Sequence, residues 1–138
     1  MKIQGIPIEL ETGWLKEANG LPKEAVDFAE RLGQILVDIG QNGRPGYNQM
    51  TTSQVRNFFG EMRRIQMKGF EKNKGAFHML KPKLAYAVAR AGRDSKIKVF
   101  QQVTNYLMEG VADQATYNNF IAFMEAVVAY HKSNGGKD

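Results

Sequence analysis

The sequence contains no cysteine and only two histidines among its 138 residues. The absence of cysteine excludes disulfide bridges, cysteine-ligated zinc and thiol nucleophiles, and it fits a reducing compartment, so we expect the protein in the cytoplasm. No apolar run approaches the ~18 residues of a membrane span. The start, MKIQGIPIEL, lacks the longer apolar core and small-residue cleavage site of a signal peptide. We therefore expect a soluble, unprocessed protein without a membrane partner.

The sequence also lacks the residue constellations of common catalytic sites. His78 and His131 fall on different predicted helices without HxxxH or HExxH spacing, and no GxSxG elbow is present. We interpret His78 as an ordinary, partly exposed residue and His131 as a helix C-terminal residue favoured by the helix dipole. The acidic residues of the first predicted helix face solvent, with no histidine or basic partner to tune one as a general acid. We predict no enzymatic activity, no metal site and no cofactor.

The remaining composition predicts one helical domain. With 138 residues and 43% hydrophobic content, the chain falls within the ~100–200 residues of a single domain. Apolar residues recur at helical spacing across 22–39, 51–69, 70–80, 82–92, 95–110 and 116–131. Residues 1–21 form an extended arm, because Ile6, Ile8 and Leu10 alternate with polar residues or proline, and residues 133–138 form a disordered tail. The fold class is all-α: a compact bundle of about five helices over 22–132, with the arm before it.

Two helices have distinctive sequence features. MTTSQV begins the second, with Thr51 and Gln54 predicted to form a capping box. Along it, Arg56 and Arg63 fall in line, Arg64 lies nearby, and Gly60 beneath them permits a close approach of another backbone or of a packed neighbouring helix. Pro82 is expected to begin the later helix, because proline cannot continue a preceding one.

The face of the Pro82 helix carries regularly spaced charges. Leu84, Val88 and Ala91 form its core side, and four residues occupy an adjoining face at i, i+3, i+7 and i+10: Lys83, Tyr86, Arg90 and Arg93. Tyr86 and Arg90 are one turn apart, close enough to stack. The last helix, from about residue 116, has an apolar face wider than a surface helix needs, which favours the centre of the bundle over an oligomer contact.

The positive charge is concentrated in one half of the chain. Residues 41–110 hold thirteen basic and four acidic side chains, a net +9, whereas the whole chain has +5. This pattern suits a surface that faces a polyanion, although a solvated basic face is an equal alternative at this point. Arginine forks bind phosphate, and an exposed tyrosine offers a stacking face. Two basic helix faces would line a groove along a nucleic-acid backbone without reading its sequence.

Two motifs in order resemble a known family. TTSQVRNFFGEMRRI and LKPKLAYAVAR resemble the small subunit of type III-A CRISPR effector complexes, and the similarity covers residues 50–131. The resemblance implies a non-catalytic helical bundle, present in several copies as a minor filament beside the backbone and large subunits. Those copies line the groove where target RNA pairs with guide RNA. Candidate RNA contacts carried by motif position are Arg56, Arg63, Arg64, Lys81, Lys83 and Arg90, with Arg93 a weaker extension; Tyr86 is added by spacing.

Two other functions stay open from the sequence alone. A DNA-binding regulator would use the Pro82–Gly92 helix for recognition, but that helix lacks the Asn or Gln that often reads adenine. An architectural homo-oligomer would use its basic face only for solubility. We expect instead a structural subunit that binds RNA backbones independently of sequence, because guide and target change while the protein does not.

Overall fold

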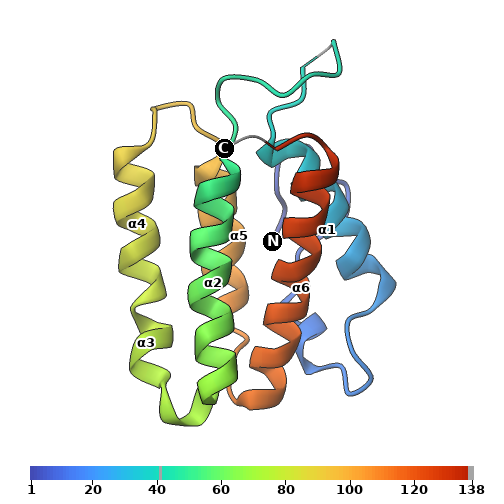
Figure 1. Cartoon of the computed structure of the whole chain (residues 1–138). Helices are drawn as coiled ribbons and strands as arrows, with labels where there is room; N and C mark the ends of the chain where they lie inside the picture. Colours follow the sequence, from blue (N-terminus) through green and yellow to red (C-terminus); the bar gives the residue numbers. More distant parts are fainter. Residues whose placement is uncertain (41, 137–138) are drawn as a thin grey trace.

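A computed structural model of the chain describes residues 1–40 and 42–136, and its regular elements are helices (Figure 1). Five α-helices in these ranges have eleven residues or more: α1 (Lys23–Leu36), α2 (Thr52–Lys68), α4 (Leu80–Arg90), α5 (Ile97–Met108) and α6 (Gln114–Ser133). The shorter elements are η1 (Thr12–Lys16), η2 (Phe70–Lys72) and α3 (Lys74–His78). Among the described residues the only β pairing is an isolated bridge between Ile3 and Ile6. The predicted all-α bundle is confirmed.

Helix α6 lies at the centre of the bundle, as its wide apolar face predicted. It packs between α1 and α2, and the side chains of Tyr117, Phe120 and Phe123 are fully buried. The Tyr117 hydroxyl donates a hydrogen bond of 2.6 Å to the Met62 carbonyl on α2. On the other side, Gly33 of α1 allows a close approach, since a Cβ there would lie 2.6 Å from the Tyr130 Cβ. These contacts tie the faces of the bundle to one helix.

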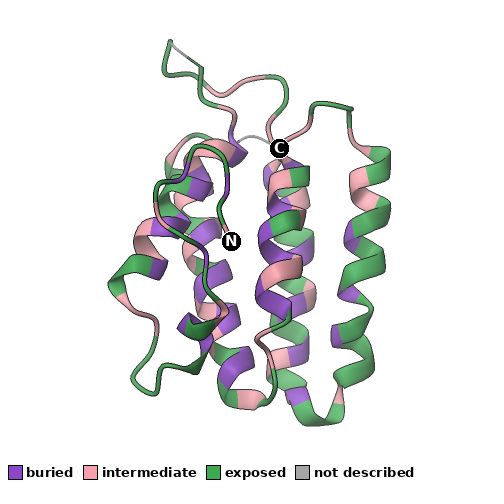
Figure 2. Ribbon diagram, turned by 180° about the vertical axis from the view of Figure 1, so that it is seen from behind, coloured by how far each residue is buried: buried purple, intermediate pink, exposed green. Residues whose placement is uncertain are grey.

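The segment predicted as an N-terminal arm packs against the bundle rather than extending from it (Figure 2). Its buried residues join the main core: Ile3, Ile6, Leu10, Trp14 and Leu15. Gly5, with φ of 89°, makes the tight turn between Ile3 and Ile6. The Asn119 amide on α6 donates to the carbonyls of Leu15 and Glu17. The period-two pattern therefore marked residues that alternate between the core and solvent, without a strand.

Helix α2 begins as predicted, and α4 differs from the prediction at both ends. Thr51 Oγ accepts from the Gln54 amide, and the Gln54 side chain accepts from the Thr51 amide, which completes the capping box. Helix α4 begins at Leu80, so Pro82 is its third residue, where a missing N–H costs no intrahelical bond. It ends at Arg90 because Ala91 is extended, with ψ of 164°. Arg93 therefore does not continue the helical face.

The C-terminal end of α6 corrects the interpretation of His131. This residue lies in the last turn of α6, but its side chain is buried and its Nε2 lies 2.6 Å from the Met50 carbonyl oxygen. Burial, together with the nearby Lys132 charge, lowers its pKa, so it is a neutral core residue rather than a cation at a helix end. Beyond α6, Asn134 and Gly136 donate to α6 carbonyls. Lys137 and Asp138, part of the tail predicted to be disordered, lie outside the described residues.

Candidate nucleic-acid interface

Helices α2 and α4 lie side by side and bring the two sequence motifs together (Figure 1). Glu61 on α2 is the meeting point. Its carboxylate is 2.9 Å from the Arg64 guanidinium and 3.8 Å from the Lys83 ammonium group of α4. Arg64 and Lys83 therefore lie on one surface, which the spacing within each motif left open. Their charge is partly offset, because the same carboxylate pairs with both.

Tyr86 and Arg90 form the open part of this surface. The guanidinium of Arg90 lies 5.7 Å from the centre of the Tyr86 ring, which confirms the predicted stacking. Tyr86 is 63% exposed, so much of its side chain is accessible to solvent. Both residues line a hollow of about 320 Å³ with Gln54 of α2. An arginine fork beside an aromatic face is suited to a phosphate and an adjoining base or sugar.

Arg56 and Arg63 lie on the other side of α2, toward α6. Arg56 lines a separate hollow of about 130 Å³ together with Lys132 of α6. Arg63, seven residues further on, lies over the Phe59 ring at 5.8 Å. The predicted alignment of Arg56 and Arg63 therefore holds, but the two do not share the α2/α4 surface with Arg90. Helix α2 is a ridge with basic residues on both sides.

Gly60 lies on this ridge, and no other helix packs against it within the described chain. It is exposed, and a Cβ added at this position would meet no atom of the described chain within 4 Å. Of the two alternatives for Gly60, packing against a neighbouring helix is therefore wrong within the described chain. The ridge is open to solvent at this residue, between Arg56 and Arg63.

Two predicted contact residues lie apart from the others. Lys81 lines a hollow on the α5 side of α4, with His78 and Glu109. Arg93 lies in the loop between α4 and α5, where its carbonyl accepts from the Lys98 ammonium group at 2.5 Å. Each residue of a helix points about 100° away from the residue before it. Lys81 therefore faces a different side of α4 from Lys83, Tyr86 and Arg90.

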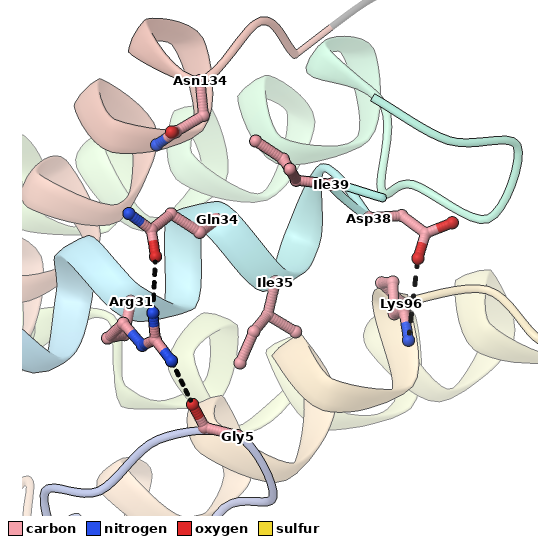
Figure 3. Close-up of a pocket in the computed structure, with 8 residues that line it drawn as sticks. All are labelled: Gly5, Arg31, Gln34, Ile35, Asp38, Ile39, Lys96 and Asn134. Atoms are coloured by element: carbon pink, nitrogen blue, oxygen red, sulfur yellow. Dashed lines mark hydrogen bonds and ion pairs between the residues drawn. The ribbon is translucent and has the colours of Figure 1, made fainter. Parts of the chain in front are cut away.

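A hollow of about 510 Å³ is lined by another set of residues (Figure 3). It lies between the Gly5 turn, α1 and the residue before α5. Its cations have partners within the chain, since Arg31 donates hydrogen bonds to the Gly5 carbonyl and to Gln34, and Lys96 forms an ion pair of 3.8 Å with Asp38. Cations held in this way are less available to an external polyanion than Arg90 is.

Within residues 1–40 and 42–136, no three acidic or histidine side chains gather as a metal-binding group. None of the helices described there combines the length and apolar content that a bilayer crossing requires. Sequence reasoning missed Lys132 and Glu61, because the relation of Lys132 to Arg56 and of Glu61 to Lys83 depends on tertiary packing. The sequence did contain one local indication, because Glu61 and Arg64 are spaced i, i+3, at which oppositely charged side chains of a helix can pair.

Comparisons with known proteins agree with the motifs. Residues 20–137 match the family described as Csm2 Type III-A. A curated relative from Streptococcus thermophilus, described as "CRISPR system Cms protein Csm2", is 30% identical over 119 residues, which span 82% of this chain and 93% of that protein. No solved structure matches the chain.

Proposed function

Because the chain belongs to the Csm2 family of type III-A CRISPR complexes, we propose that it is a non-catalytic, RNA-binding structural subunit of such a complex. It lines the groove that holds guide and target RNA and contacts their backbones independently of sequence. Its protein partners are further copies of itself and the backbone and large subunits, and its location is the cytoplasm. The predicted absence of catalysis is part of this proposal.

The observation that carries the proposal is the exposed pair Tyr86 and Arg90, with Lys83 and Arg64 on the same α2/α4 surface. Cations in a row along two packed helices follow a phosphate backbone. Among the described residues that line the α2/α4 hollow, the amide side chain is that of Gln54, which already accepts from the Thr51 amide in the capping box, so its oxygen is committed to the fold. The surface is thus supplied with phosphate contacts and a stacking face rather than with free amides for reading bases.

The electrostatics set the expected strength of binding. If about three phosphates are neutralised by Lys83, Arg90 and Arg64, the logarithm of the affinity for single-stranded RNA falls with the logarithm of salt concentration with a slope near −2. Binding by one isolated copy is therefore weak and lost at high salt. Several copies along one RNA would add their contacts and bind far more tightly.

A direct experiment measures RNA binding by the purified chain. Fluorescence anisotropy with a labelled single-stranded RNA should show salt-dependent binding that Lys83→Glu with Arg90→Glu reduces roughly tenfold or more. The matched control is Lys2→Glu with Lys16→Glu, because both lysines are exposed and belong to the N-terminal segment, away from α4. Equal losses in both variants would mean that only net charge matters. Tighter binding to one duplex DNA sequence than to any RNA would favour a DNA-binding regulator instead.

A further inference from the structure

The hollow between α2 and α6 gathers two cations from different helices. Arg56 comes from the first turns of α2, and Lys132 comes from the last turn of α6. Within the described residues, no carboxylate forms an ion pair with either side chain. His131, which also lines the hollow, donates to the Met50 carbonyl. The hollow therefore has two unneutralised positive charges.

A buried hydroxyl in the same hollow has no partner. Thr52 lines the hollow, the residue is 4% exposed, and its Oγ has no hydrogen-bond partner among the described residues. Buried hydroxyls are normally hydrogen-bonded, so an unpaired one beside two cations points to a ligand that supplies an acceptor. Thr52 is also the first residue of α2, the end of a helix that favours anions.

The neighbouring end of α6 does not repel an anion as an uncapped helix end would. Its last carbonyls are already occupied, since the Tyr130 carbonyl accepts from Ser133 and Asn134 and the His131 carbonyl accepts from Gly136. Hydrogen bonds to these carbonyls reduce the negative potential at a helix C-terminus. The field in the hollow is thus set mainly by Arg56, Lys132 and the start of α2.

We propose that Arg56, Lys132 and Thr52 form a phosphate-binding site for an RNA backbone, on the side of α2 opposite Tyr86 and Arg90. This assignment rests on the proposed function and adds a second line of contact to it. Lys132 is its distinguishing residue, because neither sequence motif includes it. An RNA that contacts both sides of α2 would pass over the open ridge at Gly60.

The test uses the full, isotope-labelled chain and a single-stranded RNA of twelve uridines, followed by nuclear magnetic resonance. The amides of Thr52 and Ser53 should shift on RNA addition. Lys132→Glu, and Lys132→Gln as the milder variant, should reduce those shifts and lower RNA affinity roughly three- to tenfold, with the salt slope smaller by ~0.7. Lys68→Glu is the matched control, because Lys68 is likewise exposed in the last turn of a helix, and it should leave the Thr52 and Ser53 shifts intact.

The outcomes separate this site from the proposed function. If the Tyr86 and Arg90 amides shift while those of Thr52 and Ser53 do not, the second site is wrong and the proposed function stands. If neither pair shifts, both are overturned. If inorganic phosphate at the same phosphate concentration produces the same Thr52 and Ser53 shifts, the hollow binds free phosphate, and its assignment to an RNA backbone is wrong.

Discussion

The guanidinium of Arg90 lies 5.7 Å from the centre of the Tyr86 ring. Tyr86 precedes Arg90 by one helical turn on α4. Each residue is exposed, so the contact contributes little to the packing of the core. Tyr86 either braces Arg90 or also stacks on RNA, and the two roles have different energetics. Stacking of an aromatic side chain on a base contributes ~1–3 kcal/mol, whereas the contact between the two side chains contributes about 0.5–1 kcal/mol at an exposed site.

A double-mutant cycle separates these roles. We expect Tyr86→Leu to lower the affinity for single-stranded RNA by about 1 kcal/mol or more, even when Arg90 is already replaced by alanine. That result would show a direct contact of the ring with RNA. Loss of the whole Tyr86 effect in the Arg90→Ala background would mean that Tyr86 only positions the arginine. RNA anisotropy titrations of the two single variants and the double variant provide the measurement.

Removal of the Glu61 carboxylate should strengthen RNA binding. Glu61 pairs with both Arg64 and Lys83, so Glu61→Gln frees two cations and removes a negative charge from the surface. We expect the RNA affinity to rise several-fold and thermal stability to change by less than ~1 kcal/mol, because exposed ion pairs contribute little. Glu71→Gln is the control, since it breaks a similar i, i+3 pair with Lys74 away from the α2/α4 surface. An affinity gain of equal size in both variants would contradict the local assignment.

The buried His131 should make stability depend on pH below neutrality. Its pKa is lowered in the folded chain by burial and the nearby Lys132 charge, so the unfolded chain binds the proton first as pH falls. Stability is therefore full above the ordinary histidine pKa of ~6.5 and decreases as pH falls below it, by up to ~1.4 kcal/mol per unit. Urea unfolding at about pH 7.5 and 5.5 measures the change. His131→Gln should remove most of this dependence, and an unchanged slope in that variant would refute the prediction.

Two glycine-to-alanine substitutions test the packing of the helices, and they should change the stability of the fold in opposite directions. At Gly33, an added Cβ would lie 2.6 Å from the Tyr130 Cβ across the α1/α6 contact, so Gly33→Ala should destabilise the fold by about 1–3 kcal/mol. At Gly60, the same Cβ meets nothing within 4 Å, so Gly60→Ala should stabilise α2 by about 0.5–1 kcal/mol. Thermal unfolding of both variants measures these effects. A stable Gly33→Ala variant would show that α1 and α6 are less closely packed.

Local patterns predicted the helices well, because helical periodicity and caps depend on near neighbours in sequence. The Thr51–Gln54 box and the core positions of α5, Ile97, Phe100 and Val103, are as expected. The side of a helix that each cation occupies was less predictable. Arg56 and Lys132 meet only because α2 and α6 pack side by side. The helical spacing also predicted Arg93 on the same face as Arg90. This prediction was wrong, because α4 ends at Arg90.

Buried polar contacts were also hidden from the sequence. The C-terminal position of His131 in its helix suggested a cation at a helix end, whereas the 2.6 Å contact with the Met50 carbonyl comes from a residue far away in sequence. The same holds for the hydrogen bond from Tyr117 to Met62. Such contacts join helices whose relative placement sequence periodicity does not define. They explain why the composition of the core was predictable while the role of its polar members was not.

The most direct test of an RNA-binding role is made in the assembled complex. A type III-A effector complex reconstituted with guide RNA and the Arg63→Glu, Arg90→Glu variant should assemble, because both side chains are exposed. Its retention of labelled target RNA at moderate salt should fall about tenfold or more relative to a complex carrying the Lys2→Glu, Lys16→Glu control. Unchanged retention by the assembled Arg63→Glu, Arg90→Glu complex would contradict the assignment to RNA of both the α2/α4 surface, which holds Arg90, and the other side of α2, which holds Arg63.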